Sequence, residues 1–446
     1  MYSQPWEPTG PLAVELDWSD AVLLRDGRVL AVGGSSDRSQ APPSVQLFDP
    51  VSDTWSATTG LLRPRSEAAL VALRDGRALV IGGLNGDANA DDTQSYSSAY
   101  AFHPDTETWT KIGLMTTARA APSAAVLPDG RVLVAGGYYY VPPDWSASVQ
   151  RQVVSPSIVL AAYRSTEATE PLPSRPPLDD VDAPPHGYAL ATAEVYDPAT
   201  DTWSETGSMR YARAGAAVAT LADGRVLVVG SGSGDITGVH PDAPFSAEIY
   251  DPRTGRFSLA GQLPRIDLAT VRRLGVDLFA DRLDPAATGS LVALADGGAL
   301  LVGNAEWAKH TADIVRTLRF DGRTLTWAET GQPCASAWDD THTTLARTPG
   351  PCRMGAAVAS LPDGRILVAG GTGRPMYSEE PTPTAELYDR RSGMWTPLPE
   401  LPAGLTSDLD VALEDGSVLI VSTSQGWTPE GDLVRYSLSF RYAPSS

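Results

Sequence analysis

The chain has 446 residues and a formal net charge of −20 at pH 7. We expect such an acidic chain to avoid nucleic acids and anionic membranes, because its surface repels phosphate groups. No run approaches the ~20 apolar residues of a membrane helix, and the N-terminus lacks a basic segment followed by an apolar core. The two cysteines offer no disulfide framework, so the expected location is cytoplasmic.

An Asp-Gly pair separates two short apolar runs at seven places in the chain. The pairs begin at Asp26, Asp75, Asp129, Asp223, Asp296, Asp363 and Asp415. Five of them are followed by Arg. Each pair predicts a two-residue hairpin, since Asp-Gly supplies the positive-φ positions that such a turn needs. Self-similarity at a period near 50 residues, with four strand-like pieces per unit, indicates a β-propeller.

In chain order, a typical unit passes from the hairpin to a strand ending in Gly, then to a strand ending near Asp-Pro, and then to an aromatic strand start. The third unit is the fullest, with Gly136-Gly137, Tyr196-Asp197-Pro198 and Trp203. The seventh unit has no aromatic strand after it, and residues 1–12, which contain Trp6, supply one. We therefore predict an all-β, seven-bladed propeller of four-stranded blades over residues 1–446. The N-terminal strand joins the last blade, closing the ring and removing an exposed edge.

These features resemble the kelch repeat, in which a double Gly ends the second strand, Tyr-Asp-Pro ends the third and Trp opens the fourth. The resemblance covers nearly the whole chain and implies a galactose-oxidase-like kelch ring standing alone. Kelch geometry implies that the Asp-Gly hairpins and the Asp-Pro turns share one face, called here the hairpin face. The loops after the double Gly and those entering each innermost strand share the opposite face, called here the loop face.

Three segments exceed the length that the repeat requires, and all three fall on the loop face. They are residues 138–190 in blade three, 266–288 before blade five and 328–353 before blade six. Excess length in a repeat is where function is expected. The first segment opens with Tyr138, Tyr139 and Tyr140 and becomes Pro-rich. It is either a disordered insertion or a lid over the axial mouth, and its aromatic start favours the lid.

The third segment holds Cys334 and Cys352 with His342 between them. This spacing matches no recognised zinc pattern, so no cofactor is predicted, and a divalent metal held by Cys334, His342 and Cys352 is left as an unsupported alternative. In a reducing cytosol we expect both thiols to remain free.

An Arg recurs ten residues before the hairpin Asp in four blades, as Arg65, Arg119, Arg213 and Arg353. In kelch repeats an Arg at this place often ties adjacent blades together. The alternative is an arginine cluster facing the central cavity, because guanidinium groups bind carboxylates in bidentate geometry. In that case an acidic ligand would be the partner.

Acidic residues interrupt the small residues of the innermost strands in three neighbouring blades. Asp408 and Asp410 lie in blade seven, Asp20 follows Trp18 in blade one, and Glu67 lies in blade two. Carboxylates crowded near the axis can shift one another's pKa and form a general acid–base pair. Alternatively, they lie in wet entry loops or pair with the arginines.

Blade five breaks the double-Gly pattern with Gly303-Asn304, followed by Glu306, Trp307 and His310. Polar groups beside a Trp at the entrance to the mouth suit the orientation of a ligand. The alternative is that Glu306 and His310 are solvent-facing loop residues.

Two classes of function follow. The first is a small-molecule enzyme without a redox cofactor, an isomerase, cyclase or lyase that uses acid–base chemistry at the axial mouth. The second is a non-catalytic module that binds a protein or an acidic ligand on the loop face. A copper radical oxidase is disfavoured, because the galactose-oxidase-like site needs a Tyr-His pair and the sequence has no such dipeptide.

Overall fold

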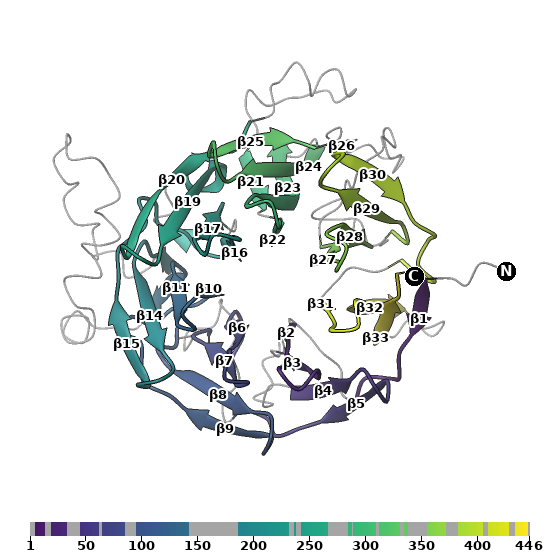
Figure 1. Cartoon of the computed structure of the whole chain (residues 1–446), viewed down its shortest axis with the longest axis horizontal. Coiled ribbons are helices and arrows are strands. Elements are labelled where there is room, and N and C mark those ends of the chain that lie inside the picture. The colour runs from purple at the N-terminus through teal and green to yellow at the C-terminus, as the bar shows by residue number, and fades with distance from the viewer. Residues whose placement is uncertain are drawn as a thin grey trace.

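The computed structural model describes residues 5–13, 19–33, 45–61, 65–84, 95–141, 186–231, 236–237, 242–265, 284–287, 289–308, 312–330, 334–337, 355–371, 382–404, 409–427 and 433–444. In these residues the chain forms seven antiparallel blades of four strands each, arranged in a ring (Figure 1). The predicted all-β, seven-bladed propeller is confirmed.

The two inner strands of each blade follow one another across the Asp-Gly hairpin. The innermost strands are β2 (Ser19–Leu23), β6 (Ala69–Ala72), β10 (Ser123–Val126), β16 (Ala217–Thr220), β22 (Ser290–Ala293), β27 (Ala357–Ser360) and β31 (Leu409–Ala412). The second strands are β3 (Val29–Gly33), β7 (Ala78–Ile81), β11 (Val132–Ala135), β17 (Val226–Val229), β23 (Ala299–Ala308), β28 (Ile366–Ala369) and β32 (Val418–Trp427). The second strands read as continuous apolar runs because blades cover both of their faces.

The two outer strands meet at the Asp-Pro turn or its equivalent. The third strands are β4 (Val45–Asp49), β8 (Ala99–His103), β14 (Ala193–Asp197), β19 (Ser246–Asp251), β24 (Ala312–Asp321), β29 (Ala385–Asp389) and β33 (Leu433–Tyr442). The outermost strands are β5 (Thr54–Ala57), β9 (Thr108–Lys111), β15 (Thr202–Glu205), β20 (Arg256–Gln262), β25 (Thr326–Glu329), β30 (Met394–Pro397) and β1 (Trp6–Pro8). A 3₁₀ turn, η1 (Ala243–Phe245), precedes β19.

Five short strands lie outside the four-stranded pattern. They are β12 (Tyr138–Val141), β13 (His186–Ala189), β18 (Ile236–Thr237), β21 (Asp284–Ala287) and β26 (Cys334–Ala337). Strands β12, β13 and β18 form a sheet of their own, whereas β21 and β26 flank the long strands β23 and β24 of blade five.

The hydrophobic core is divided among the seams between blades. Each seam has its own cluster of buried side chains, contributed by the two blades that meet there. Within each blade the predicted aromatic of the outermost strand packs on an aromatic of the third strand. An example is Tyr196–Trp203, whose ring centroids are 5.0 Å apart. These tilted pairs add apolar area where the wedge-shaped blades widen.

The ring closes as predicted. Strand β1 pairs antiparallel with β33, with Trp6 opposite Tyr442. The Trp6 side chain is 4% exposed, and its indole N–H donates to the Pro399 carbonyl of blade six. The N-terminal strand therefore completes blade seven.

The Asp-Gly hairpin differs in detail from the predicted two-residue turn. In blade one the Leu24 amide donates to the Arg28 carbonyl, and the Gly27 amide donates to the Leu24 carbonyl. This is a three-residue loop made of a type I turn and a glycine bulge. Only Gly27 has a positive φ, of 87°. The Asp26 carboxylate instead accepts the Arg28 amide and pairs with its guanidinium.

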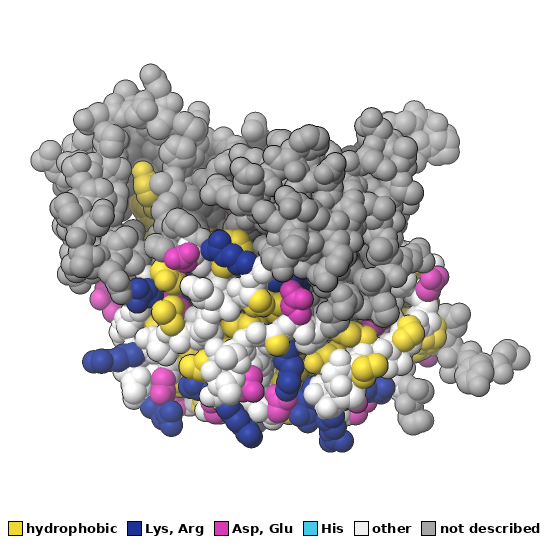
Figure 2. All heavy atoms as spheres, turned by 90° about the horizontal axis from the view of Figure 1, so that it is seen from above, with side chains coloured by type: hydrophobic (Ala, Val, Ile, Leu, Met, Phe, Trp, Pro, Cys, Tyr) yellow, Lys and Arg dark blue, Asp and Glu magenta, His cyan; other side chains and the backbone are white. Residues whose placement is uncertain are grey.

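The hairpin face carries a belt of such Asp–Arg pairs, and charged side chains of both signs line this edge of the ring (Figure 2). Several of these arginines also reach the next blade. Arg77 donates to the Pro198 carbonyl and Arg441 to the Pro50 carbonyl. In blades five and seven the hairpin lacks the Arg, and Arg319 and Arg441 of the third strands pair with the hairpin Asp instead. The belt therefore links blade to blade on this face.

Candidate functional site

Solvent reaches the innermost strands of the ring. Side chains on β2, β16 and β22 are partly or fully exposed, although these strands lie at the centre of the ring, whereas those of β7, β11, β17 and β28 are buried. The exposure defines an axial channel, and its opening on the loop face is called here the axial mouth.

A tight turn precedes the innermost strand at the mouth, and in four blades its central residue has a positive φ. These residues are Glu67 (φ 54°), Ala121 (φ 45°), Gly215 (φ 59°) and Gly355 (φ 60°). The Ala121 amide donates to the Glu67 carbonyl, and the Gly215 amide donates to the Ala121 carbonyl. The turns thus bond blades two, three and four to one another around the mouth. Glu67 occupies a left-handed position that two equivalent blades fill with Gly, and a residue with a Cβ is strained there.

The Glu67 carboxylate is bound by a side chain from the neighbouring blade. The Tyr138 hydroxyl donates to Glu67 Oε2 at 2.8 Å. Tyr138 is 5% exposed, and its backbone forms a bridge with Ala120. Glu67 itself is accessible at the mouth. Burial among the surrounding blades raises the pKa of Glu67, and the Tyr138 hydrogen bond opposes this increase. Two predicted site residues from different blades are therefore in contact.

Asp20 lies one blade away, on the channel wall formed by β2. Its side chain is accessible from the channel, but protein surrounds it on the other sides, and this burial raises the pKa of Asp20 to about 6. The amides of Ala21 and Leu70 donate to the carboxylate and oppose the increase. Leu70 belongs to blade two, so Asp20 leans toward the blade that carries Glu67.

Asp410 is not directed toward Asp20. Its neighbours Leu409 and Val411 pack into the seam with blade one. Because side chains alternate along a strand, the Asp410 side chain points toward blade six, whose β27 lies beside β31. The predicted acidic group thus separates into Asp20 and Glu67 on one side and Asp410 on the other.

The predicted arginines are structural in the blades that the structure describes. Arg65, Arg119 and Arg213 are 4%, 0% and 0% exposed. The Arg65 guanidinium donates to the Gly82 and Ser98 carbonyls and lies over the rings of Tyr96 and Tyr100. Their burial leaves no guanidinium face for a ligand, as expected from the alternative in which these arginines tie the ring together.

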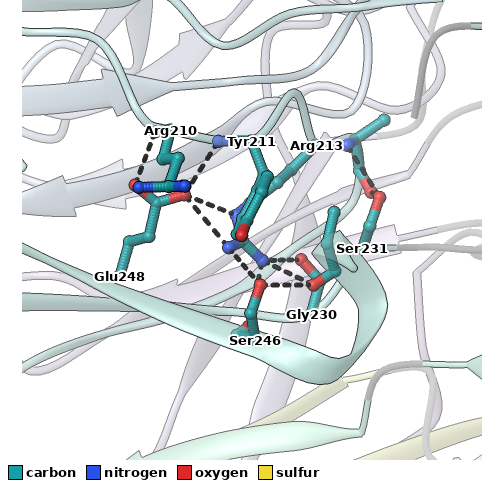
Figure 3. Close-up of polar contacts among 9 residues, drawn as sticks. Arg210, Tyr211, Arg213, Gly230, Ser231, Ser246 and Glu248 are labelled. Atoms are coloured by element: carbon teal, nitrogen blue, oxygen red, sulfur yellow. Dashed lines mark hydrogen bonds and ion pairs between the residues drawn. The ribbon is translucent and has the colours of Figure 1, made fainter. Parts of the chain in front are cut away.

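The Arg213 site shows how the tie is built (Figure 3). Its guanidinium donates to the carbonyls of Gly230, Ala243 and Ser246 and pairs with Glu248 at 3.1 Å. Burial lowers the pKa of Arg213 and the Glu248 charge opposes this shift. Meanwhile the Arg213 carbonyl accepts the Gly137 amide of blade three. The Arg213 side chain therefore bonds to groups of its own blade four, and the Arg213 carbonyl bonds to blade three.

The double glycines are required by this joint. A Cβ on Gly136 would meet the Arg213 carbonyl oxygen at 2.5 Å, and one on Gly137 would meet the Ala120 carbonyl oxygen at 2.5 Å. A larger residue at Gly136 would displace blade four, and one at Gly137 would displace the segment that enters blade three itself.

The acidic partners Glu194 and Glu248 were not predicted from the sequence. Glu194 pairs with Arg119 at 3.1 Å, and both side chains are almost fully buried. A signal was present, because Ala-Glu precedes the aromatic-Asp end of the third strand at Glu194, Glu248 and Glu386. These are the same blades, three, four and six, in which Arg119, Arg213 and Arg353 occur.

The predicted lid is only partly described. Its two ends pair as strands β12 and β13, with Tyr139 opposite Tyr188, and β13 runs parallel to β18 of blade four. Burial raises the pKa of Tyr139. Residues 142–185 lie outside the described part of the chain, so the lid stays a prediction.

Of the remaining predicted site residues, the structure describes some and leaves others outside the described part of the chain. Glu306 and Trp307 lie on the extension of β23, opposite Pro285 and Asp284 of β21. Tyr140 lies on β12 and Cys334 on β26, with backbone alone described. Four further predicted site residues lie outside the described residues: Trp18, His310, Arg353 and Asp408.

Within the described residues, no group of three or more His, Cys, Asp or Glu side chains comes together to hold a metal ion. His103 is the one histidine whose side chain is described, and it bonds the Thr110 hydroxyl at 2.8 Å. A galactose-oxidase-like copper set therefore does not assemble in this part of the chain. Nor does it contain a helix long and apolar enough to cross a membrane.

The ring and its solvent-open mouth define a seven-bladed β-propeller. Residues 64–116, which form most of blade two, match the family model described as Kelch motif. With a four-stranded blade built seven times around the ring, the chain is a seven-bladed β-propeller whose blade two carries a kelch motif.

Solved structures share this fold at low sequence identity. One is described as a novel fungal alcohol oxidase with catalytic diversity among the AA5 family, in complex with copper. It matches 98% of this chain and 76% of its own, with a TM-score of 0.58 and 16% identity. Another, described as the structure of YjhT, matches 87% of this chain and 99% of its own, with a TM-score of 0.50 and 14% identity. No curated protein matches the sequence.

Proposed function

We propose that this propeller binds a small organic molecule at the axial mouth and acts on it by proton transfer, as an isomerase, cyclase or lyase does. The observation that carries the proposal is the 2.8 Å contact between the Tyr138 hydroxyl and the Glu67 carboxylate. It holds a solvent-accessible carboxylate of one blade with a phenol of the next, at the opening of a channel.

Glu67 is suited to exchange a proton with a ligand. Burial raises the pKa of Glu67, which makes its proton easier to exchange with a ligand than that of a free carboxylic acid. Tyr138 fixes the orientation of the carboxylate and, by donating to it, favours the ionised form. Asp20, with a pKa of about 6, supplies a second acid–base group on the neighbouring blade.

The backbone at Glu67 supports a functional role for this side chain. Two of the three equivalent turns use Gly215 and Gly355, which adopt a positive φ without strain, and the third uses Ala121, whose side chain is a single methyl group. A glutamate there costs stability without filling the core, since its side chain is exposed. Strained residues of this kind cluster at functional sites.

The test is a thermal-shift screen of the full chain against sugars, acidic metabolites, and polyketide- and terpenoid-like compounds, followed by mass spectrometry of any compound that binds. The variant Glu67→Gln keeps the size of the side chain and removes its charge. Glu414→Gln, on the hairpin face, is the matched control. We expect a saturable shift and conversion that Glu67→Gln abolishes and Glu414→Gln retains.

Binding with no change in the compound would make the chain a ligand-binding module. If Glu67→Gln converted a substrate as fast as the parent chain, the assignment of Glu67 would be overturned.

A further inference from the structure

The small sheet beside blade three joins the two ends of the longest insertion. Its strands β12 and β13 pair antiparallel, with Tyr138 opposite Ala189 and Tyr140 opposite Gly187. Residues directly opposite one another share a face of a sheet, and so do alternate residues along a strand. Tyr138 and Gly187 therefore lie on the same face of this sheet, although the whole insertion separates them in sequence.

The ring of Tyr138 occupies the place where a side chain at position 187 would lie. A Cβ built on Gly187 would meet Tyr138 Cδ2 at 2.5 Å, Cε2 at 3.0 Å and Cγ at 3.3 Å. Carbon atoms in contact lie about 3.5–4.0 Å apart, so the Cβ and the ring exclude one another. Gly187 is not among the glycines with a positive φ. Its backbone would therefore accept another residue, and it is the Tyr138 ring that excludes one.

Strand β13 has little freedom to move away from the ring. It is the middle strand of its sheet, paired with β12 on one edge and with β18 of blade four on the other. Directly after β13, the Leu190 amide donates to the Gly137 carbonyl, and the Leu190 carbonyl accepts the Arg213 amide. A Cβ at position 187 would therefore displace the Tyr138 ring rather than the strand.

The backbone of Tyr138 is held in place too. Its amide donates to the Ala120 carbonyl and its carbonyl accepts the Ala120 amide, each at 2.8 Å. Turning the ring about its long axis gives no relief at Cγ, which lies on that axis. It would also turn the ring edges against Leu84, Ala120 and Ala214, which pack with Tyr138. The ring must therefore swing as a whole.

Such a swing breaks the contact with Glu67. The phenol hydroxyl is farther from the backbone than Cδ2, so it moves farther than the crowded edge of the ring. Its hydrogen bond to Glu67 Oε2 is 2.8 Å long, and a hydrogen bond is lost beyond about 3.5 Å.

We propose that Gly187 is a positioning residue for Glu67: by leaving room for the Tyr138 ring, it keeps the phenol hydroxyl on the Glu67 carboxylate. Gly187 acts through Tyr138, and the inference rests on the proposed function, in which Glu67 exchanges a proton with a ligand. The strand that returns from the insertion is thereby as much a part of the site as the strand that begins it.

The test follows the ionisation of Glu67 directly, so it needs no substrate. The full chain is labelled with ¹³C at the side-chain carboxyl of glutamate, and the resonance of Glu67 is the one missing from Glu67→Gln. Titration by NMR compares the parent chain with Gly187→Ala, Tyr138→Phe and the double variant. The Tyr138 hydrogen bond opposes the burial that raises the pKa of Glu67. We therefore expect Gly187→Ala to raise this pKa as far as Tyr138→Phe does, and the double variant to raise it no further.

Gly113→Ala is the matched control. A Cβ on Gly113 would meet the Asp201 carbonyl oxygen at 2.9 Å, and Gly113 has no positive φ either. Its carbonyl accepts the indole N–H of Trp203 on an outermost strand, so it lies far from the mouth. We expect this variant to lose thermal stability while the pKa of Glu67 stays at its parent value.

Three results would overturn the proposal. They are a Glu67 pKa in Gly187→Ala equal to that of the parent, a further rise when Gly187→Ala is added to Tyr138→Phe, and an equal rise in Gly113→Ala. If Gly187→Ala does not fold, Tyr138→Ala is added to remove the ring. Recovery of the folded chain supports the proposal, and failure to recover overturns it.

The two proposals fail separately. If no compound is converted, Glu67 loses its proposed role in proton transfer, and the titration still decides whether Gly187 positions it.

Discussion

The hydroxyl of Tyr138 donates to the carboxylate of Glu67 across the seam between blades two and three, joining residues 71 positions apart in sequence. Tyr138 is also the first residue of the longest insertion, and Glu67 belongs to the turn that enters the axial channel. The hydrogen bond therefore joins the first residue of the predicted lid to the turn at the entrance of the channel.

Removing the phenol hydroxyl tests this coupling. We expect Tyr138→Phe to lower the free energy of unfolding by about 1 kcal/mol, the usual worth of one hydrogen bond. The bond lowers the pKa of Glu67, so its loss should raise that pKa further. If Glu67 acts as a base, the acidic limb of the pH–rate profile should move to higher pH. An unchanged limb together with lower stability would leave Tyr138 a structural residue only.

The backbone strain at Glu67 predicts a difference between two substitutions that both remove the carboxylate. Glu67→Gly relieves the left-handed conformation, whereas Glu67→Ala keeps it. We expect the Gly variant to be more stable than the Ala variant by about 1 kcal/mol in denaturant unfolding. The same pair of substitutions at Glu414, which has no positive φ, should favour Ala instead. Equal stabilities at position 67 would contradict the strain.

Asp20 predicts a dependence of stability on pH. Its pKa in the folded chain is about 6 against an ordinary value of 3.8, so between these values the folded state binds more protons than the unfolded state. The contribution of Asp20 to stability therefore falls as pH rises from about 4 to 6, and the penalty is complete above that range. Asp20→Asn removes the penalty, and its stability relative to the parent should rise across this range by about 1 kcal/mol. An unscreened shift would give roughly 3 kcal/mol, but the side chain is exposed to the channel.

Asp363→Asn is the matched control, with the opposite sign. The Arg365 guanidinium holds the pKa of Asp363 below its ordinary value, so this pair stabilises the chain at neutral pH and loses its effect as pH falls through the folded pKa. Thermal unfolding of both variants and the parent chain from pH 2 to 8 measures the two slopes, since the slope from Asp363 lies below pH 3.8. Parallel slopes for the two variants would refute the assignment to Asp20.

The buried joint of blade four predicts a large loss of stability. Arg213→Met leaves the Glu248 carboxylate and several carbonyls without their guanidinium partner, and we expect a loss of about 3–5 kcal/mol. Arg131→Met, which breaks a surface pair with Asp129 on the hairpin face, should cost less than about 1 kcal/mol. Urea unfolding of the two variants compares them directly. A loss in Arg213→Met no larger than in Arg131→Met would show that the joint carries little stability.

Ring closure predicts that a residue near the N-terminus is as important as a core residue. Trp6 packs on Tyr442 with ring centroids 5.0 Å apart and is almost fully buried. We expect Trp6→Ala to lower the free energy of unfolding by about 3–5 kcal/mol and to increase proteolysis within blade seven. Trp109→Ala, whose ring is half-buried on an outermost strand, is the comparison and should cost less.

The repeated residues made the fold predictable, because the hairpin and the aromatic pair recur in every blade and the double Gly in four of them. The site was less predictable, since it depends on which side chains of different blades meet. Glu67 stood out as an acid among small residues, but its contact with Tyr138 depends on the twist that brings the start of one blade's insertion over its neighbour. The Arg–Glu joints could have been found by aligning the third strands.

The pairing of β1 with β33 also sets the order of events when the chain is made. Strand β1 has no partner until the ribosome has produced residues 433–442, by which time six blades already have all their strands. At about 5–20 residues per second, this interval is roughly 20 to 80 s. During that time Trp6, one of the most apolar side chains near the N-terminus, remains uncovered. The propeller therefore stays an open arc until β1 pairs with β33, which joins two strands at opposite ends of the ring's chain order.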